Sequence, residues 1–164
     1  MTLPEQERER FCQVLHHSRT SLYRLAFSIT RNSSDAQEAV AEAVCRAYER
    51  YPQLREKEKL PRWLLKITAN EARRLCQRRG RTVSLDDLPT EPAIPGRETG
   101  DDTLWQAVQT LPRDQREAVV LFYYEDLPTE EIARIVGTSP GAVRVRLSRA
   151  REKLRNLLKE GDHE

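Results

Sequence analysis

Apolar positions recur with helical spacing along most of this chain, and strand-like alternation is rare. The segment 139–159 shows the pattern most clearly. Ser139 followed by Pro140 is typical of an N-cap with proline in the first helical position. Beyond them the apolar residues recur at steps of three and four, which places them on one narrow stripe of a helix: Val143, Leu147, Ala150, Leu154 and Leu158. We therefore expect an all-α protein with an amphipathic helix over 139–159.

The opposite face of that helix is polar and basic. Its members are Gly141, Arg144, Val145, Ser148, Arg149 and Arg155. Between Gly141 and Lys159 there are seven Lys or Arg residues and one Glu. Such a face is suited to lie along an anion, and the alternative interpretation is a charged surface that only water covers. The residues that precede this helix favour the interpretation that the face binds an anion.

Three shorter helices are expected before it. The pattern predicts them over 103–110, over 113–124 and from Thr129 to a stop at Gly137. The turn Gly137-Thr138-Ser139 then leads into the basic helix. A short helix, a turn with glycine and a basic amphipathic helix make up the helix-turn-helix, whose second helix enters the DNA major groove. We expect this part of the chain to bind DNA.

The first 80 residues predict a second helical group. One or two helices are expected over 5–30, followed by a turn and cap signal over 31–34 and a helix over 35–51. The outer face of the helix over 35–51 is acidic and holds Asp35, Glu38, Glu42 and Glu49. An acidic stripe is most often solvated, but it is also what a helix needs to dock on a basic partner.

A further helix over 62–79 carries six basic residues and one acid, Glu71. Apolar side chains cluster on one side, and basic and amide groups gather on the other: Arg62, Lys66, Asn70, Arg73, Arg74 and Gln77. Trp63 stands at the edge of this basic face. An aromatic ring beside cations can stack a nucleic-acid base while the cations hold phosphates. Periodicity alone leaves a core anchor equally open for Trp63.

Charge divides the chain into three parts. Residues 1–80 hold 16 basic and 10 acidic side chains, residues 81–102 hold 2 and 6, and residues 103–164 hold 10 and 10. The middle part has three prolines, two glycines and no helical period, which predicts a flexible acidic linker. A connection of that length is unusual inside a compact domain. The predicted organisation is a domain over 1–80, a linker over 81–102 and a domain over 103–164.

Few residues indicate other chemistry. Cys12, Cys45 and Cys76 lack disulfide or zinc spacing, and their odd number favours a reducing compartment. Cys12 and His16 share a helix face, yet without further ligands we expect no metal. No apolar run is long enough to span a bilayer or to act as a signal region, so a cytoplasmic protein without membrane insertion is expected. No nucleophile constellation or glycine-rich phosphate loop indicates an enzyme, and no cofactor is expected.

Two blocks of the sequence resemble the extracytoplasmic-function (ECF) type of bacterial sigma factors. The stretch LPRDQREAVVLFYYEDLPTEEIARIVGTSPGAVRVRLSRAREKL resembles their region four, and GAVRVRLSRARE is its most specific part. The stretches SLYRLAFSITRNSSDAQEAVAEAVCRAYERY and LPRWLLKITANEARRLCQRR resemble region two. Together the blocks cover about three quarters of the chain, in the family's order.

The resemblance implies a dissociable subunit that binds RNA polymerase core, directs it to promoters and has an anti-sigma factor as a further partner. The residues that match the family's surface for the core enzyme are Asp35, Glu38 and Glu42. Those expected to open and recognise the −10 element are Arg62, Trp63, Lys66, Asn70, Arg73 and Arg74. Those expected at the −35 duplex are Ser139, Gly141, Arg144, Val145, Ser148 and Arg149, with Arg146 and Arg151 at the flanks. By the same resemblance, the acidic linker runs toward the RNA exit path.

Region two also departs from the family's pattern. Gln37, Ala41 and Val44 stand where Glu, Gln and an aromatic residue are common, so core binding is expected to be weaker or differently distributed. The loop before Pro61 is rich in charge, and no base-capturing residue is assigned to it. The second hypothesis is a stand-alone helix-turn-helix regulator with an N-terminal interaction domain, which would bind duplex DNA without polymerase.

Overall fold

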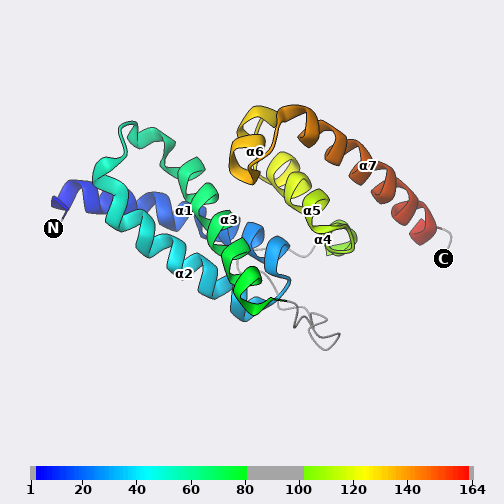
Figure 1. Ribbon diagram of the computed structural model, residues 1–164, viewed down its shortest axis with the longest axis horizontal. Coiled ribbons are helices and arrows are strands. Elements are labelled where there is room, and N and C mark those ends of the chain that lie inside the picture. Colours follow the sequence, from blue (N-terminus) through cyan, green and yellow to red (C-terminus); the bar gives the residue numbers. More distant parts are fainter. Residues whose placement is uncertain (1–2, 81–101, 163–164) are drawn as a thin grey trace. The chain divides into compact units, whose positions relative to one another are not determined.

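The computed structural model describes residues 3–80 and 102–162 (Figure 1). Helices make up nearly all of these two ranges, and neither contains a strand, which confirms the all-α prediction. The chain divides into two compact units, residues 1–95 and 96–164. The linker expected over 81–102 lies outside the described residues except for its last residue, so its boundaries stay a prediction.

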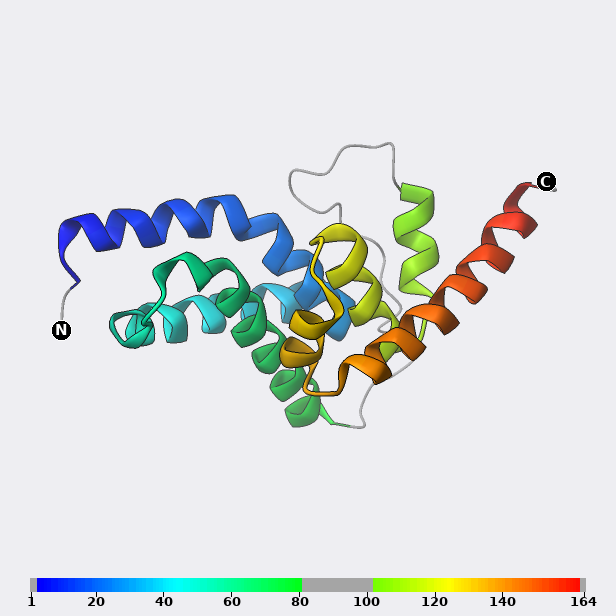
Figure 2. The same ribbon diagram turned by 90° about the horizontal axis from the view of Figure 1, so that it is seen from above.

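The first unit is built from α1 (Glu5–Thr30), α2 (Ser33–Arg50) and α3 (Leu60–Arg79), each of which packs against the other two (Figure 1, Figure 2). Large apolar side chains of α1 and α3 meet a row of alanines on α2. Those with no measurable exposure include Leu22, Leu25, Leu60, Leu64, Ala36, Ala43 and Ala47. Burial of each large apolar side chain contributes roughly 1.5–3 kcal/mol. The short alanines let α2 lie close to its neighbours, which brings charged groups on α2 and α3 within reach.

The turn between α1 and α2 forms where the cap signal predicted it. Arg31 adopts a left-handed φ of 53° and donates its N–H to the carbonyl of Phe27 at 2.7 Å, which closes α1. Asn32 then caps α2, because its Oδ1 accepts the N–H of Asp35 at 2.9 Å. An N-cap of this kind is worth about 1 kcal/mol. It fixes the residue at which the acidic face of α2 begins.

Two short 3₁₀ turns, η1 (Tyr51–Gln53) and η2 (Lys57–Lys59), connect α2 to α3. Tyr51 is fully buried, and its ring packs edge-on against Phe11 with the centroids 5.3 Å apart. The ammonium of Lys57 lies 4.1 Å from the centroid of the Tyr51 ring and donates to the Tyr51 carbonyl. The charged loop is thus anchored at its first residue, although few of its own side chains enter the core.

The second unit contains α4 (Asp102–Gln109), α5 (Arg113–Val119), η5 (Val120–Tyr124), α6 (Thr129–Val136) and α7 (Pro140–Asp162). The helix predicted over 113–124 is present, but its last turn, η5, is a π-helix. There the N–H of Glu125 bonds to the carbonyl of Val120, five residues back, at 3.2 Å. Such a widened turn is rare and usually a single turn long.

The core of the second unit gathers apolar side chains from each of these helices around α7. They include Trp105, Val108, Leu121, Ile132, Val143, Leu147 and Ala150. The apolar stripe predicted for α7 is correct up to Leu154 and wrong at Leu158, which is 39% exposed. Residues 155–159 are all exposed, because the helix and its periodic sequence continue beyond the side chains that cover its first part.

Candidate nucleic-acid interface

The helix-turn-helix of α6 and α7 is held by backbone hydrogen bonds and one side-chain cap. Gly137 has a φ of 76° and donates its N–H to the carbonyl of Ala133 at 2.8 Å; Thr138 donates to the same carbonyl at 3.0 Å. A side chain is strained at this φ, which is why glycine belongs there. Ser139 Oγ accepts the N–H of Ala142 at 3.1 Å, which confirms the predicted N-cap of α7.

The polar face of α7 is exposed from Arg144 to Lys159, the last residue whose side chain the structure describes. The residues predicted for the −35 element that are exposed are Ser139, Arg144, Val145, Ser148 and Arg149, and Gly141 is half-buried. Val145 is 48% exposed, so an apolar side chain stands among the polar ones on this face. Five of these residues share one side of α7, opposite its buried stripe, and Ser139 caps the helix just before them; together they present cations, hydroxyls and an apolar group.

The arginines predicted for the flanks contact the chain itself. Arg146 Nε lies 3.8 Å from Oδ2 of Asp114 on α5. Arg151 donates from Nε to the hydroxyl of Tyr123, and its guanidinium lies 5.6 Å from the ring centroid of Phe122. These contacts tie α7 to α5 and η5. They also separate the flanking arginines from Arg144 and Arg149, which project on the exposed face.

The basic face predicted for α3 is exposed as well. Arg62, Lys66, Asn70 and Arg74 are exposed at steps of four, and Arg73 is half-buried beside them. Asn70 Oδ1 accepts a hydrogen bond from Arg73 Nη1 at 3.2 Å, so its amide group is oriented on this face. Trp63 is half-buried. Its ring therefore packs in part on the unit and leaves part of its surface to a partner.

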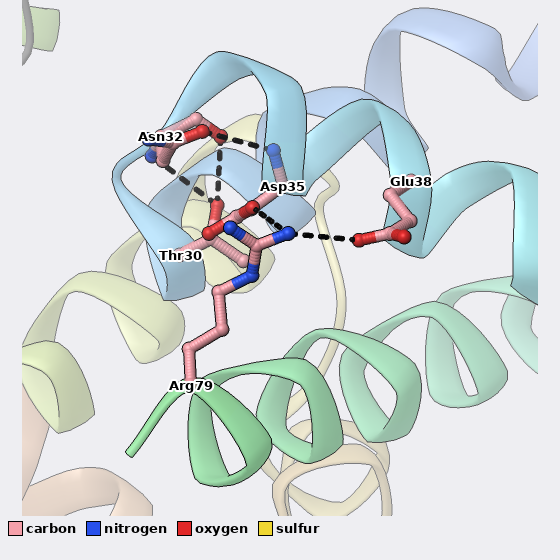
Figure 3. A network of polar contacts seen from close by, with 5 residues as sticks. All are labelled: Thr30, Asn32, Asp35, Glu38 and Arg79. Carbon is pink, nitrogen blue, oxygen red and sulfur yellow. Dashed lines mark hydrogen bonds and ion pairs between the residues drawn. The ribbon is translucent and has the colours of Figure 1, made fainter. Parts of the chain in front are cut away.

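The acidic face of α2 is less uniform than the sequence implied. Glu38 and Glu42 have side chains more than half exposed, whereas that of Asp35 is only 13% exposed. Arg79, on the last turn of α3, reaches between two of these acids (Figure 3). Its Nη2 lies 3.1 Å from Asp35 Oδ1 and 3.4 Å from Glu38 Oε2. The first turn of α2 is thus partly neutralised by a cation of the same unit.

Family models and individual relatives match both units. The model of sigma-70 region 2 matches residues 14–82, and that of sigma-70 region 4 matches residues 101–154. The RNA polymerase sigma factor SigV of Bacillus subtilis is 32% identical over 142 residues, which span 85% of this chain and 86% of SigV. The ECF RNA polymerase sigma factor EcfG of Rhodopseudomonas palustris is 32% identical over 143 residues, which span 84% and 79%. This chain belongs to the ECF sigma factors.

A solved relative agrees with the assignment. The sigma factor RpoE of Bartonella quintana, crystallised with the anti-sigma factor NepR, is 30% identical to this sigma factor. The two superpose with a TM-score of 0.74, over 91% of this chain and 96% of that one. A stand-alone regulator would account for the helix-turn-helix unit but not for the match to region 2. The protein is an alternative sigma factor that directs transcription initiation.

Three charged residues of the sigma factor make contacts that the sequence analysis did not anticipate. Besides Arg79, they are Glu71 and Arg46. Glu71 Oε1 lies 2.7 Å from Arg46 Nε and 3.0 Å from Arg74 Nη1, and Arg46 also pairs with Glu42 at 3.6 Å. The position of Glu71 in the sequence was enough to predict a buried ion pair. It follows Ile67 by four residues and precedes Leu75 by four, so an acid stands in the buried stripe and requires a cation opposite.

The described part of the sigma factor also bears on metals and membranes. Within it, no group of three His, Cys, Asp or Glu side chains is placed to hold a metal ion. None of its helices is both long and apolar enough to cross a bilayer.

Proposed function

We propose that this sigma factor recognises its promoters through two basic faces, that of α7 at the −35 element and that of α3 at the −10 element. One observation carries the proposal: both helices present a row of cations on the side opposite their buried apolar stripe. Cations on an exposed helix face suit the phosphate backbone, and side chains among them can reach bases.

At the −35 element, α7 enters the major groove. Arg144 and Arg149 contact base edges or adjacent phosphates, because an arginine fork can bind guanine O6 and N7 together. Val145 lies between them and suits the methyl group of a thymine. Ser139 and Gly141 lie at the start of α7, where the helix N-terminus favours a phosphate, and Ser148 completes the face.

At the −10 element, α3 holds an opened strand. The exposed cations bind phosphates, the amide of Asn70 forms hydrogen bonds with a base edge, and the exposed part of the Trp63 ring stacks on a base. The cations in question are Arg62, Lys66, Arg73 and Arg74. Stacking on an aromatic ring is worth about 1–3 kcal/mol per base, which offsets part of the cost of separating the strands.

The core enzyme binds to the acidic face of α2. Glu38 and Glu42 make direct contacts, since both are well exposed, and the largely covered Asp35 adds negative charge to the same face, which Arg79 partly neutralises. The sigma factor itself performs no chemistry, because the polymerase core forms the phosphodiester bonds. It acts in the cytoplasm without a cofactor, and an anti-sigma factor binds it and holds it inactive; the relative RpoE was crystallised in complex with an anti-sigma factor, NepR.

Transcription with purified core polymerase tests this function. Core is incubated with genomic DNA fragments with and without the sigma factor, and the 5′ ends of the transcripts are mapped. New start sites that share two spaced sequence elements are the expected result. An absence of new start sites, together with no co-elution of the protein with core, would contradict the proposed function. If the protein then bound duplex DNA tightly without core, the stand-alone regulator would be supported instead.

A further inference from the structure

Within the basic helix α3, one acidic side chain is almost fully covered. Glu71 is 5% exposed, and a single oxygen, Oε1, meets two arginines from different helices. Arg46 of α2 approaches it at 2.7 Å and Arg74 of α3 at 3.0 Å. A buried carboxylate is costly unless cations and hydrogen bonds compensate its lost hydration. The two arginines are what allow this carboxylate to be buried.

The two partners of Glu71 face different surroundings. Arg46 is on α2, where it also pairs with Glu42, so it belongs to the contact between α2 and α3. Arg74 is 51% exposed and lies on the face of α3 that we assign to the −10 element. One carboxylate thus holds one cation that joins helices and one cation that projects toward solvent.

We propose that Glu71 is a positioning residue for promoter opening: it orients the guanidinium of Arg74 toward a phosphate of the opened −10 strand. The proposal rests on the −10 face described above. An arginine side chain has several rotatable bonds, and ordering it only when DNA binds costs entropy. The hydrogen bond from Arg74 Nη1 to Glu71 holds one edge of the guanidinium, and the remaining N–H groups can donate to a phosphate.

The variant Glu71→Gln distinguishes two roles of the Glu71 charge, because they change the affinity for DNA in opposite directions. The variant keeps the size of the side chain and a hydrogen-bond acceptor but removes the charge. If the charge merely repelled DNA, its removal would raise affinity. If it orients Arg74, its removal lowers affinity, and the salt dependence of binding falls because one phosphate contact is lost.

The experiment uses holoenzyme assembled from core and the full-length sigma factor. The probe is fork-junction DNA that carries the single-stranded −10 segment of a promoter found by start-site mapping. We expect Glu71→Gln to weaken binding on the order of threefold to tenfold. The slope of log K against log salt should decrease by about 0.7, the value for one phosphate of a single strand. If Glu71→Gln does not fold, Glu71→Asp, which withdraws the carboxylate by one methylene, provides the same comparison.

Double variants separate positioning from stability. In an Arg74→Ala background, Glu71→Gln should have no further effect on DNA binding, because the group through which it acts is absent. In an Arg46→Ala background it should keep its full effect. Arg46→Ala alone should lower the unfolding temperature and leave the salt slope unchanged.

Three results would overturn the inference: an unchanged or raised affinity of Glu71→Gln, a full effect of Glu71→Gln when Arg74 is already alanine, and a wild-type affinity of Arg74→Ala. Wild-type affinities of Lys66→Ala and Asn70→Ala would instead contradict the −10 face. The failure of the proposed function is therefore distinguishable from the failure of this inference.

Discussion

Arg79 Nη2 lies 3.1 Å from Oδ1 of Asp35, although 44 positions separate the two residues in the chain. The same nitrogen lies 3.4 Å from Oε2 of Glu38 (Figure 3). A cation from the end of α3 therefore occupies the first turn of the helix that we assign to the core enzyme. Any basic group of the polymerase that approaches Glu38 has to compete with Arg79.

Replacement of Arg79 by alanine should strengthen binding to the core enzyme, on the order of twofold, because Glu38 loses its internal partner. The stability of the first unit should change by about 1 kcal/mol or less, as is usual for exposed ion pairs. Titration of labelled sigma factor with core at two salt concentrations measures the effect. Arg78→Ala is the matched control, since it removes the same charge from the neighbouring exposed position. Equal affinities of the two variants would show that Arg79 does not compete with the core.

Replacement of Arg144 or Arg149 by alanine should reduce use of promoters that depend on their −35 element. A lost base contact costs about 1–3 kcal/mol and relaxes the preference at that position. Run-off transcription from a mapped promoter and from −35 point variants measures both effects. Lys153→Ala removes a cation from another exposed position of α7 and should leave the preference intact. Wild-type transcription with an unchanged −35 preference in both arginine variants would exclude this face of α7.

Gly137→Ala should destabilise the second unit by about 1–2 kcal/mol, because the left-handed conformation at φ 76° is unfavourable for any residue with a Cβ. Steric overlap does not contribute, since no atom lies within 4 Å of the added carbon. Gly141→Ala is the control of opposite sign: its Cβ meets only atoms at 3.9 Å, and alanine favours a helix by up to about 1 kcal/mol. Thermal unfolding of the two variants decides. A Gly137→Ala protein as stable as the wild type would contradict the left-handed backbone conformation at this position.

Alkaline pH should destabilise the first unit through Tyr51. Burial raises the pKa of this hydroxyl above its usual value, Glu7 raises it further, and Arg10 opposes the rise. The folded protein then keeps the proton at a pH where the unfolded chain has lost it, so stability falls as the pH rises above about 10. Tyr51→Phe retains the packing against Phe11 and should lose less stability than the wild type between about pH 9 and pH 11. Denaturant unfolding at each pH measures the difference, and parallel losses in both proteins would contradict the prediction.

Local patterns were sufficient for the helices and for their faces. The cap signal over 31–34, the stop at Gly137 and the cap at Ser139 depend on neighbouring residues only. The last two form as the sequence predicts, and within 31–34 the cap is Asn32, so that α2 begins at Ser33, two residues before the predicted start. The same holds for the exposed cations of α3 and α7, since a helix places residues three and four apart on one side. Periodicity failed at Leu158, because a repeating pattern does not show where the core that it faces comes to an end.

Charge pairing across helices could not be predicted in this way. The sequence shows that Asp35 and Glu38 share a face, but not that Arg79 of α3 pairs with both. It shows that Glu71 falls among apolar positions, but not that its carboxylate also reaches Arg46 on α2. The pairs Glu42–Arg46 and Glu71–Arg74, by contrast, join residues four and three apart on one helix, and helical spacing is enough to predict them. The physical reason is the separation along the chain. Contacts within a helix join residues three or four apart, whereas the pairs of Arg79 with Asp35 and of Arg46 with Glu71 form only when α3 packs on α2.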